Sequence, residues 1–168
     1  DIFESQFHFP PVRQYRTGTC WSLSAISYME SEVHRLTGQE IKLSEMYIVY
    51  WEYVERARAF VEKRGDVYFA QGSEATAVLR MMNKHGIVPY DDYPGLPPGK
   101  KYHNHGRMFS EMDDYLESVK ENNAWNTVMV VSTIRSILDK HMGEPPQRII
   151  WEDEIFNPDN FMKEILQL

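Results

Sequence analysis

Apolar residues spaced three or four apart constrain this chain more than any other feature. After Cys20 they stand at Trp21, Ala25, Ile26, Met29, Val33 and Leu36. This spacing puts them on one face of a helix, which Thr19 can cap and Thr37-Gly38 can end. The pattern therefore predicts a helix whose first turn carries Cys20.

The same spacing predicts a mainly helical chain with one short strand. Further helices are expected from Ser44 to about Gly65, from Ser73 to Gly86, from a capping box at Ser110 onward, from Asn123 to Gly143 and from Asn157-Pro158 to the end, with a strand at Arg148 to Trp151. Residues 1–18 are expected to be irregular. Residues 89–107 are rich in proline and glycine and carry no period, so they are expected to form a loop or linker at an internal boundary.

The composition favours a folded protein without nucleic-acid or membrane partners. The 168 residues are 42% hydrophobic and 13% aromatic, which is enough to bury a core. A net charge of −7 removes the general attraction to phosphate backbones, and no apolar run is long enough to span a membrane. Because Asp1 opens no signal segment, a cytoplasmic protein is expected, with an exported protein that has lost its signal as the alternative.

Cys20 is the single cysteine, so its thiol has no internal disulfide partner and is free for chemistry or for burial. A thiol at a helix N-terminus meets unpaired backbone amides and the positive end of the helix dipole, which favours a nucleophilic thiolate. A carbonyl under attack also needs donors for its oxyanion, and the Cys20 amide and the Gln14 carboxamide could supply them. Gly18 would let a substrate backbone approach closely. The segment therefore indicates a nucleophile.

Gln14, followed after five residues by Cys20-Trp21 at a helix start, resembles the nucleophile signature of the papain family. Thr17-Gly18-Thr19 lacks the second cysteine of the secreted members, which is similar to the bleomycin hydrolase and aminopeptidase C branch. Four further segments resemble this branch, namely Leu43 to Met46, Gly72, Lys84 to Pro89 and Gly143 to Glu152. The resemblance covers about residues 13–95 and 134–168.

The resemblance implies an α+β papain-like fold and a thiol peptidase, most simply an aminopeptidase. Residues 1–95 would form the helical lobe with the nucleophile helix, and residues 96–168 a linker and a helical insertion, with the β-rich second lobe missing. It assigns Cys20 as nucleophile, Gln14 as oxyanion donor, and Gly18, Trp21, Gly72 and Ser73 as residues that line the substrate. It implies a peptide substrate, no cofactor and no metal, and hexamers in relatives.

Ser73 stands where the family has a second glycine, so its side chain is expected to narrow the substrate cleft. The chain also departs from the family in its catalytic base, the histidine that takes the thiol proton. His105 and Asn123 superficially resemble the family's catalytic histidine and asparagine, but they are rejected because the family places both on strands of the second lobe. His105 is instead expected to be a solvated loop histidine, and Asn123 a helix start. The true pair is expected downstream, and this chain alone should have no turnover.

Other interpretations are weaker. A metal site at His103, His105, Asp91 and Asp92 lacks a complete ligand set. The aromatic run from Tyr47 to Tyr53 is expected to be core rather than a stacking surface, and the acidic residues between 113 and 121 a solvated helix face. The competing function is a non-catalytic papain-like domain for binding or assembly, which the downstream sequence would distinguish.

Overall fold

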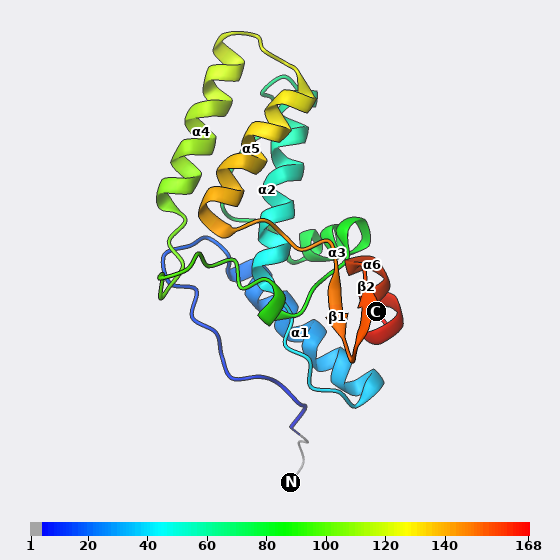
Figure 1. Cartoon of the computed structure of the whole chain (residues 1–168). Helices are drawn as coiled ribbons and strands as arrows, with labels where there is room; N and C mark the ends of the chain where they lie inside the picture. Colours follow the sequence, from blue (N-terminus) through cyan, green and yellow to red (C-terminus); the bar gives the residue numbers. More distant parts are fainter. Residues whose placement is uncertain (1–4) are drawn as a thin grey trace.

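The computed structural model describes residues 5–168; residues 1–4, part of the stretch predicted to be irregular, lie outside the described range. The helices and strands are α1 (Cys20–Thr37), α2 (Glu45–Glu62), α3 (Ala75–His85), η1 (Tyr90–Asp92), α4 (Gly106–Glu121), α5 (Thr127–Met142), β1 (Ile149–Trp151), β2 (Glu154–Phe156), α6 (Pro158–Asn160) and η2 (Phe161–Ile165). Figure 1 follows them from the blue N-terminus to the red C-terminus. The mainly helical class predicted from the spacing is confirmed.

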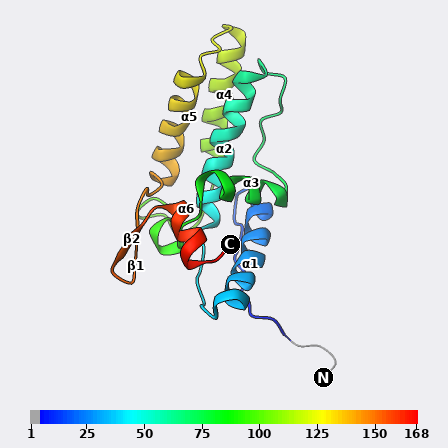
Figure 2. The same cartoon turned by 90° about the vertical axis from the view of Figure 1, so that its right-hand side faces the viewer.

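α2 is the central helix of the fold. It packs against α1 and α3 along one part and against α5 along another, while α4 covers α5. Figures 1 and 2 show α4 and α5 standing beside one half of α2, with α1, α3 and the C-terminal elements around the other half. α2 thus connects the region around Cys20 to the pair formed by α4 and α5.

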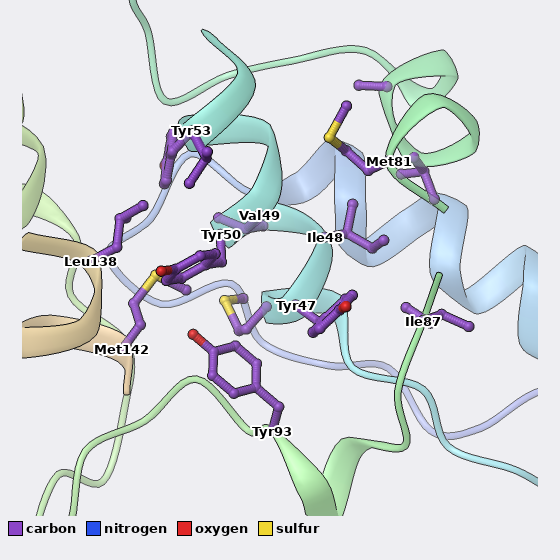
Figure 3. Close-up of a cluster of buried hydrophobic side chains, with 14 of the residues drawn as sticks. Tyr47, Ile48, Val49, Tyr50, Tyr53, Met81, Ile87, Tyr93, Leu138 and Met142 are labelled. Carbon is purple, nitrogen blue, oxygen red and sulfur yellow. The ribbon is translucent and has the colours of Figure 1, made fainter. Parts of the chain in front are cut away.

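Tyrosines of α2 form the centre of the core, as the aromatic spacing predicted. Tyr50 and Tyr53 are fully buried, and Figure 3 shows them facing Leu138 and Met142 of α5. The Tyr50 hydroxyl donates a hydrogen bond to Asp139 of α5 at 2.7 Å. A buried ring whose hydroxyl is satisfied, as in Tyr50, fixes the register between two helices as well as adding apolar area. The core is therefore continuous across the loop at residues 89–107, and the division at residue 95 stays a prediction.

Three helix starts differ from the predictions. The third helix begins at Ala75, and Ser73 does not cap it because its hydroxyl bonds to α2 instead. α4 begins at Gly106, four residues before the predicted capping box at Ser110. The fifth helix is capped by Asn126, whose side chain accepts a hydrogen bond from the Met129 amide, and not by Asn123. In each case the apolar spacing was correct and the choice among nearby polar residues was not.

The C-terminal region contains the predicted strand and one more. β1 pairs with β2 in an antiparallel hairpin, with Ile150 opposite Ile155. The last helix opens at Asn157-Pro158, as predicted, and the Asn157 side chain caps it by accepting a hydrogen bond from the Asn160 amide. The helix then widens into a π-turn at η2. Gly86 approaches this region so closely that a Cβ there would lie 2.2 Å from the Pro158 carbonyl carbon. Gly86 therefore allows the chain leaving α3 to pack against α6.

Candidate active site

Cys20 is the first residue of α1, and its side chain is exposed. The Thr19 carbonyl accepts hydrogen bonds from the amides of Ser22 and Leu23, which begins the helix. The predicted cap by the Thr19 side chain is wrong: its hydroxyl lies 2.6 Å from the Thr17 hydroxyl and makes no capping bond. The amides of Cys20 and Trp21 precede these bonds and have no partner within the helix, so they are available as hydrogen-bond donors at the thiol end of α1.

Gln14 is held in a turn that leads to Cys20. Its carboxamide nitrogen donates to the Thr17 carbonyl, and the Thr17 hydroxyl donates back to the Gln14 carbonyl at 2.9 Å. Tyr15 between them has a φ of 54°, a left-handed conformation that costs a tyrosine energy. The turn therefore depends on these two bonds, which fix where the carboxamide lies.

Gly18 and Trp21 both bind the same loop residue, Gln71. The Gly18 amide donates to the Gln71 side-chain carbonyl at 3.2 Å, and the Trp21 indole donates to its backbone carbonyl at 3.4 Å. A Cβ on Gly18 would lie 2.8 Å from the Gln71 Cβ, so only glycine fits without a shift. Gln71 thereby joins the nucleophile loop, residues 14–19 before the proposed nucleophile Cys20, to the segment that carries Gly72.

Gly72 has empty space beside it, whereas the Ser73 side chain is bonded to neighbouring residues. A Cβ on Gly72 would meet nothing within 4 Å, which leaves room for a chain to lie beside it. The Ser73 hydroxyl donates to Glu52 at 2.8 Å and accepts from Arg56 at 3.0 Å. Its side chain is thus turned toward α2, which corrects the expectation that it narrows the cleft. Arg56 also donates to the Ala70 carbonyl, so α2 fixes this segment at two points.

A groove of ≈ 320 Å³ is lined by both Cys20 and Gln14. Glu30, Lys42 and Glu45 also line it, and the Lys42 ammonium lies 2.8 Å from Glu30 and 2.6 Å from Glu45. Burial raises the pKa of Glu30 against the hydrogen bonds it accepts from Lys42 and the Leu43 amide. Two carboxylates around one ammonium give this wall of the groove a negative balance.

No histidine among residues 5–168 makes a hydrogen bond to the Cys20 thiol, whereas papain-type chemistry needs an imidazole there. His105 and Asn123 stand beyond opposite ends of the 16-residue α4, which separates them by about 24 Å. Their rejection as a catalytic pair is therefore confirmed. The expectation that His105 is solvated is wrong, because it is 3% exposed and burial lowers its pKa to about 4.

Among residues 5–168, no cluster of three or more histidine, cysteine, aspartate or glutamate side chains is arranged to hold a metal ion. No helix in that range is long and apolar enough to cross a membrane.

The fold and the site define the helical part of a papain-like cysteine peptidase, with a thiol at the start of a helix and a glutamine beside it. The chain belongs to the Peptidase C1-like family, whose family model matches residues 2–164. Its relatives place it in the bleomycin hydrolase and aminopeptidase C branch, as the sequence motifs indicated.

Aminopeptidase C of Listeria innocua is 22% identical over 192 residues, covering 99% of this chain and 43% of the relative. Aminopeptidase C of Listeria monocytogenes is 22% identical over 179 residues, covering 92% of this chain and 40% of the relative. The crystal structure of PepW from Lactobacillus rhamnosis superposes with a TM-score of 0.79 at 17% identity, over 98% of this chain and 45% of PepW. The chain thus spans less than half the length of the relatives it matches.

The sequence motifs did not identify the residues that hold the segment around Gly72 and Ser73 in place. Gln71 carries no motif, and its only signal is its position before Gly72. Glu52 and Arg56 stand four residues apart on a helix, a common surface pairing, yet Glu52 is 3% exposed and both reach Ser73. The one available signal for their role was a charged pair on a helix whose neighbouring residues are apolar and buried.

Proposed function

We propose that this chain is the nucleophile-bearing part of a thiol aminopeptidase. The observation that carries the proposal is an exposed Cys20 at the start of α1, in one groove with Gln14. An exposed thiol at a helix N-terminus is the setting in which cysteines act as nucleophiles, whereas structural cysteines are buried. Family membership supports the same chemistry.

In the proposed reaction the Cys20 Sγ attacks the carbonyl carbon of a peptide bond, a C–S bond forms, and the carbonyl oxygen becomes an oxyanion. The backbone N–H of Cys20 donates to that oxygen, and Gln14 supplies the second donor. A carboxamide nitrogen has two N–H groups, so one can stay on the Thr17 carbonyl while the other faces the oxyanion. The C–N bond then breaks, and the amine leaves with the proton that the thiol gave up. Water hydrolyses the thioester, which releases the carboxylic acid and restores the Cys20 thiol.

The substrate backbone is proposed to lie beside Gly72, where the space for a Cβ is empty. Gly18 and Trp21 hold this segment from the nucleophile loop through Gln71. Ser73 anchors it to α2 and lines the substrate through its backbone. The side chains that determine where the substrate lies are therefore fixed by bonds inside the helical part.

The histidine base and the residue that orients it are proposed to come from outside residues 1–168. Support comes from the absence of a histidine bonded to Cys20 within residues 5–168 and from relatives more than twice as long. The restriction to amino-terminal residues rests on the aminopeptidase C relatives. A cytoplasmic location and a homo-oligomer, a hexamer in relatives, remain further proposals.

The experiment compares the longer protein that contains this chain with its Cys20→Ser variant, using fluorogenic amides of single amino acids and the same amides with a blocked amino group. The proposal predicts hydrolysis of the unblocked amides, none in Cys20→Ser, and none by residues 1–168 alone. Equal activity in the Cys20→Ser variant, or no hydrolysis by the longer protein, would contradict it and favour a non-catalytic papain-like domain.

A further inference from the structure

A second cavity, of ≈ 590 Å³, lies where the loop before α4 meets the start of α4 and the end of α5. In Figure 1 this loop runs beside the N-terminal segment, below the lower ends of α4 and α5. The cavity shares no lining residue with the groove at Cys20. The proposed peptidase reaction does not use it.

The charge lining this cavity is positive, in a chain whose net charge is −7. Its lining contains four cationic side chains and no carboxylate, the cations being Lys100, Lys101, Arg107 and Lys140. Glu111 lies close by and already pairs with Arg107 and Lys140. Lys100 and Lys101 form no ion pair within residues 5–168, so their charges are available to a ligand.

His105 provides a second and independent observation. It lines the cavity and is 3% exposed, yet neither of its ring nitrogens has a hydrogen-bond partner within residues 5–168. A buried polar atom without a partner costs free energy, and such atoms in native proteins are usually satisfied by water or a ligand. A neutral imidazole offers one N–H donor, which suits the oxygen of an anion.

The backbone adds donors of the same kind. The cavity lies at the N-terminus of the 16-residue α4, where the first-turn amides have no intrahelical partners and the dipole favours negative charge. One of them, the Gly106 amide, donates to the Asn104 side chain at 3.2 Å, and the amides that follow it are left to donate to a ligand. Lysines, an unpartnered imidazole and a helix N-terminus all select the same ligand chemistry.

We propose that this cavity binds an oxyanion, either a phosphate or a carboxylate group, through Lys100, Lys101 and the ring N–H of His105. The same loop is bonded to the nucleophile segment, because the Arg16 amide donates to the His103 carbonyl at 3.2 Å and the His105 amide donates to the Arg16 carbonyl at 3.1 Å. A bound anion would therefore order the chain that precedes Cys20. The anion site stands whether or not Cys20 acts on peptides.

The test titrates residues 1–168 with inorganic phosphate and, separately, with N-acetylglutamate at low ionic strength, following the ring nitrogens of His105 by NMR. The proposal predicts saturable binding of at least one anion, a shift of the His105 nitrogens, and affinity that falls as salt is added. The tighter of the two anions identifies the source of the oxyanion.

The double variant Lys100→Ala/Lys101→Ala removes two exposed cations without touching the core and should weaken binding about tenfold or more. Lys163→Ala is the matched control, since Lys163 pairs with Asp159 on α6, outside the cavity lining, and should leave binding unchanged. Non-saturable binding of both anions, unchanged affinity in the double variant, or unshifted His105 nitrogens would overturn the proposal.

Discussion

The Gly18 amide donates to the side chain of Gln71 at 3.2 Å, joining two segments that are 53 residues apart. This bond, with the Trp21 indole on the Gln71 carbonyl, sets the distance between the nucleophile loop and the open position at Gly72. In secreted relatives of the papain family a cysteine just before the nucleophile makes a disulfide, and here hydrogen bonds and close packing join the loop to its neighbour.

Gly18→Ala should therefore destabilise the fold. The new methyl would lie 2.8 Å from the Gln71 Cβ, and the shift needed to relieve that contact costs about 1–3 kcal/mol. Gly72→Ala is the control, because nothing lies within 4 Å of its Cβ and it should change the free energy of unfolding by less than about 0.5 kcal/mol. Chemical denaturation measures both, and equal effects would contradict the packing described for Gly18.

Ser73→Ala should lower the free energy of unfolding by about 1–2 kcal/mol, because it removes a hydroxyl that bonds both Glu52 and Arg56. Ser136→Ala, on the exposed face of α5, provides a serine whose hydroxyl bonds only its own helix. That control should remain within about 0.5 kcal/mol of the parent. A Ser73→Ala variant as stable as Ser136→Ala would show that the bonds to α2 do not hold the segment.

Lys42→Met should cost about 3 kcal/mol or more, because it leaves Glu30 and Glu45 buried without their cation. Arg35→Met is the matched control, since the Arg35–Glu32 pair is exposed and exposed pairs contribute little. Thermal and urea unfolding compare the two variants. Similar losses of stability in the two variants would mean that Glu30 and Glu45 are hydrated, which would contradict their burial.

His105 should make the fold weaken as the pH falls. Burial, with lesser repulsion from His103 and His141, lowers the pKa of His105 to about 4 from an ordinary 6.5. The unfolded chain therefore binds a proton first, so stability is complete above about pH 6.5 and is lost as the pH falls toward 4. His105→Leu should remove about 2 kcal/mol of the loss between pH 7 and pH 5. Denaturant titrations at both pH values measure it, and an unchanged pH dependence would contradict the burial of His105.

The helices could be predicted from the sequence because apolar spacing is a local signal, and the proposed nucleophile could be singled out because Gln14 and Cys20 lie on one short segment. The roles of Ser73 and His105 could not. Ser73 is a good capping residue, but its hydroxyl bonds Glu52, which lies 21 residues earlier on α2. The burial of His105 depends on α2 and α5, which its own loop does not specify. Long-range packing decided both positions.

The most direct test of the central claim is the alkylation rate of Cys20 by iodoacetamide at pH 6, measured on the folded chain and on the same chain unfolded in urea. The unfolded chain is an internal reference, because it carries the same single thiol without the helix. If Cys20 is a nucleophile prepared by the N-terminus of α1, the folded chain reacts faster than the unfolded chain. A folded chain that reacts at the same rate or more slowly would contradict the assignment.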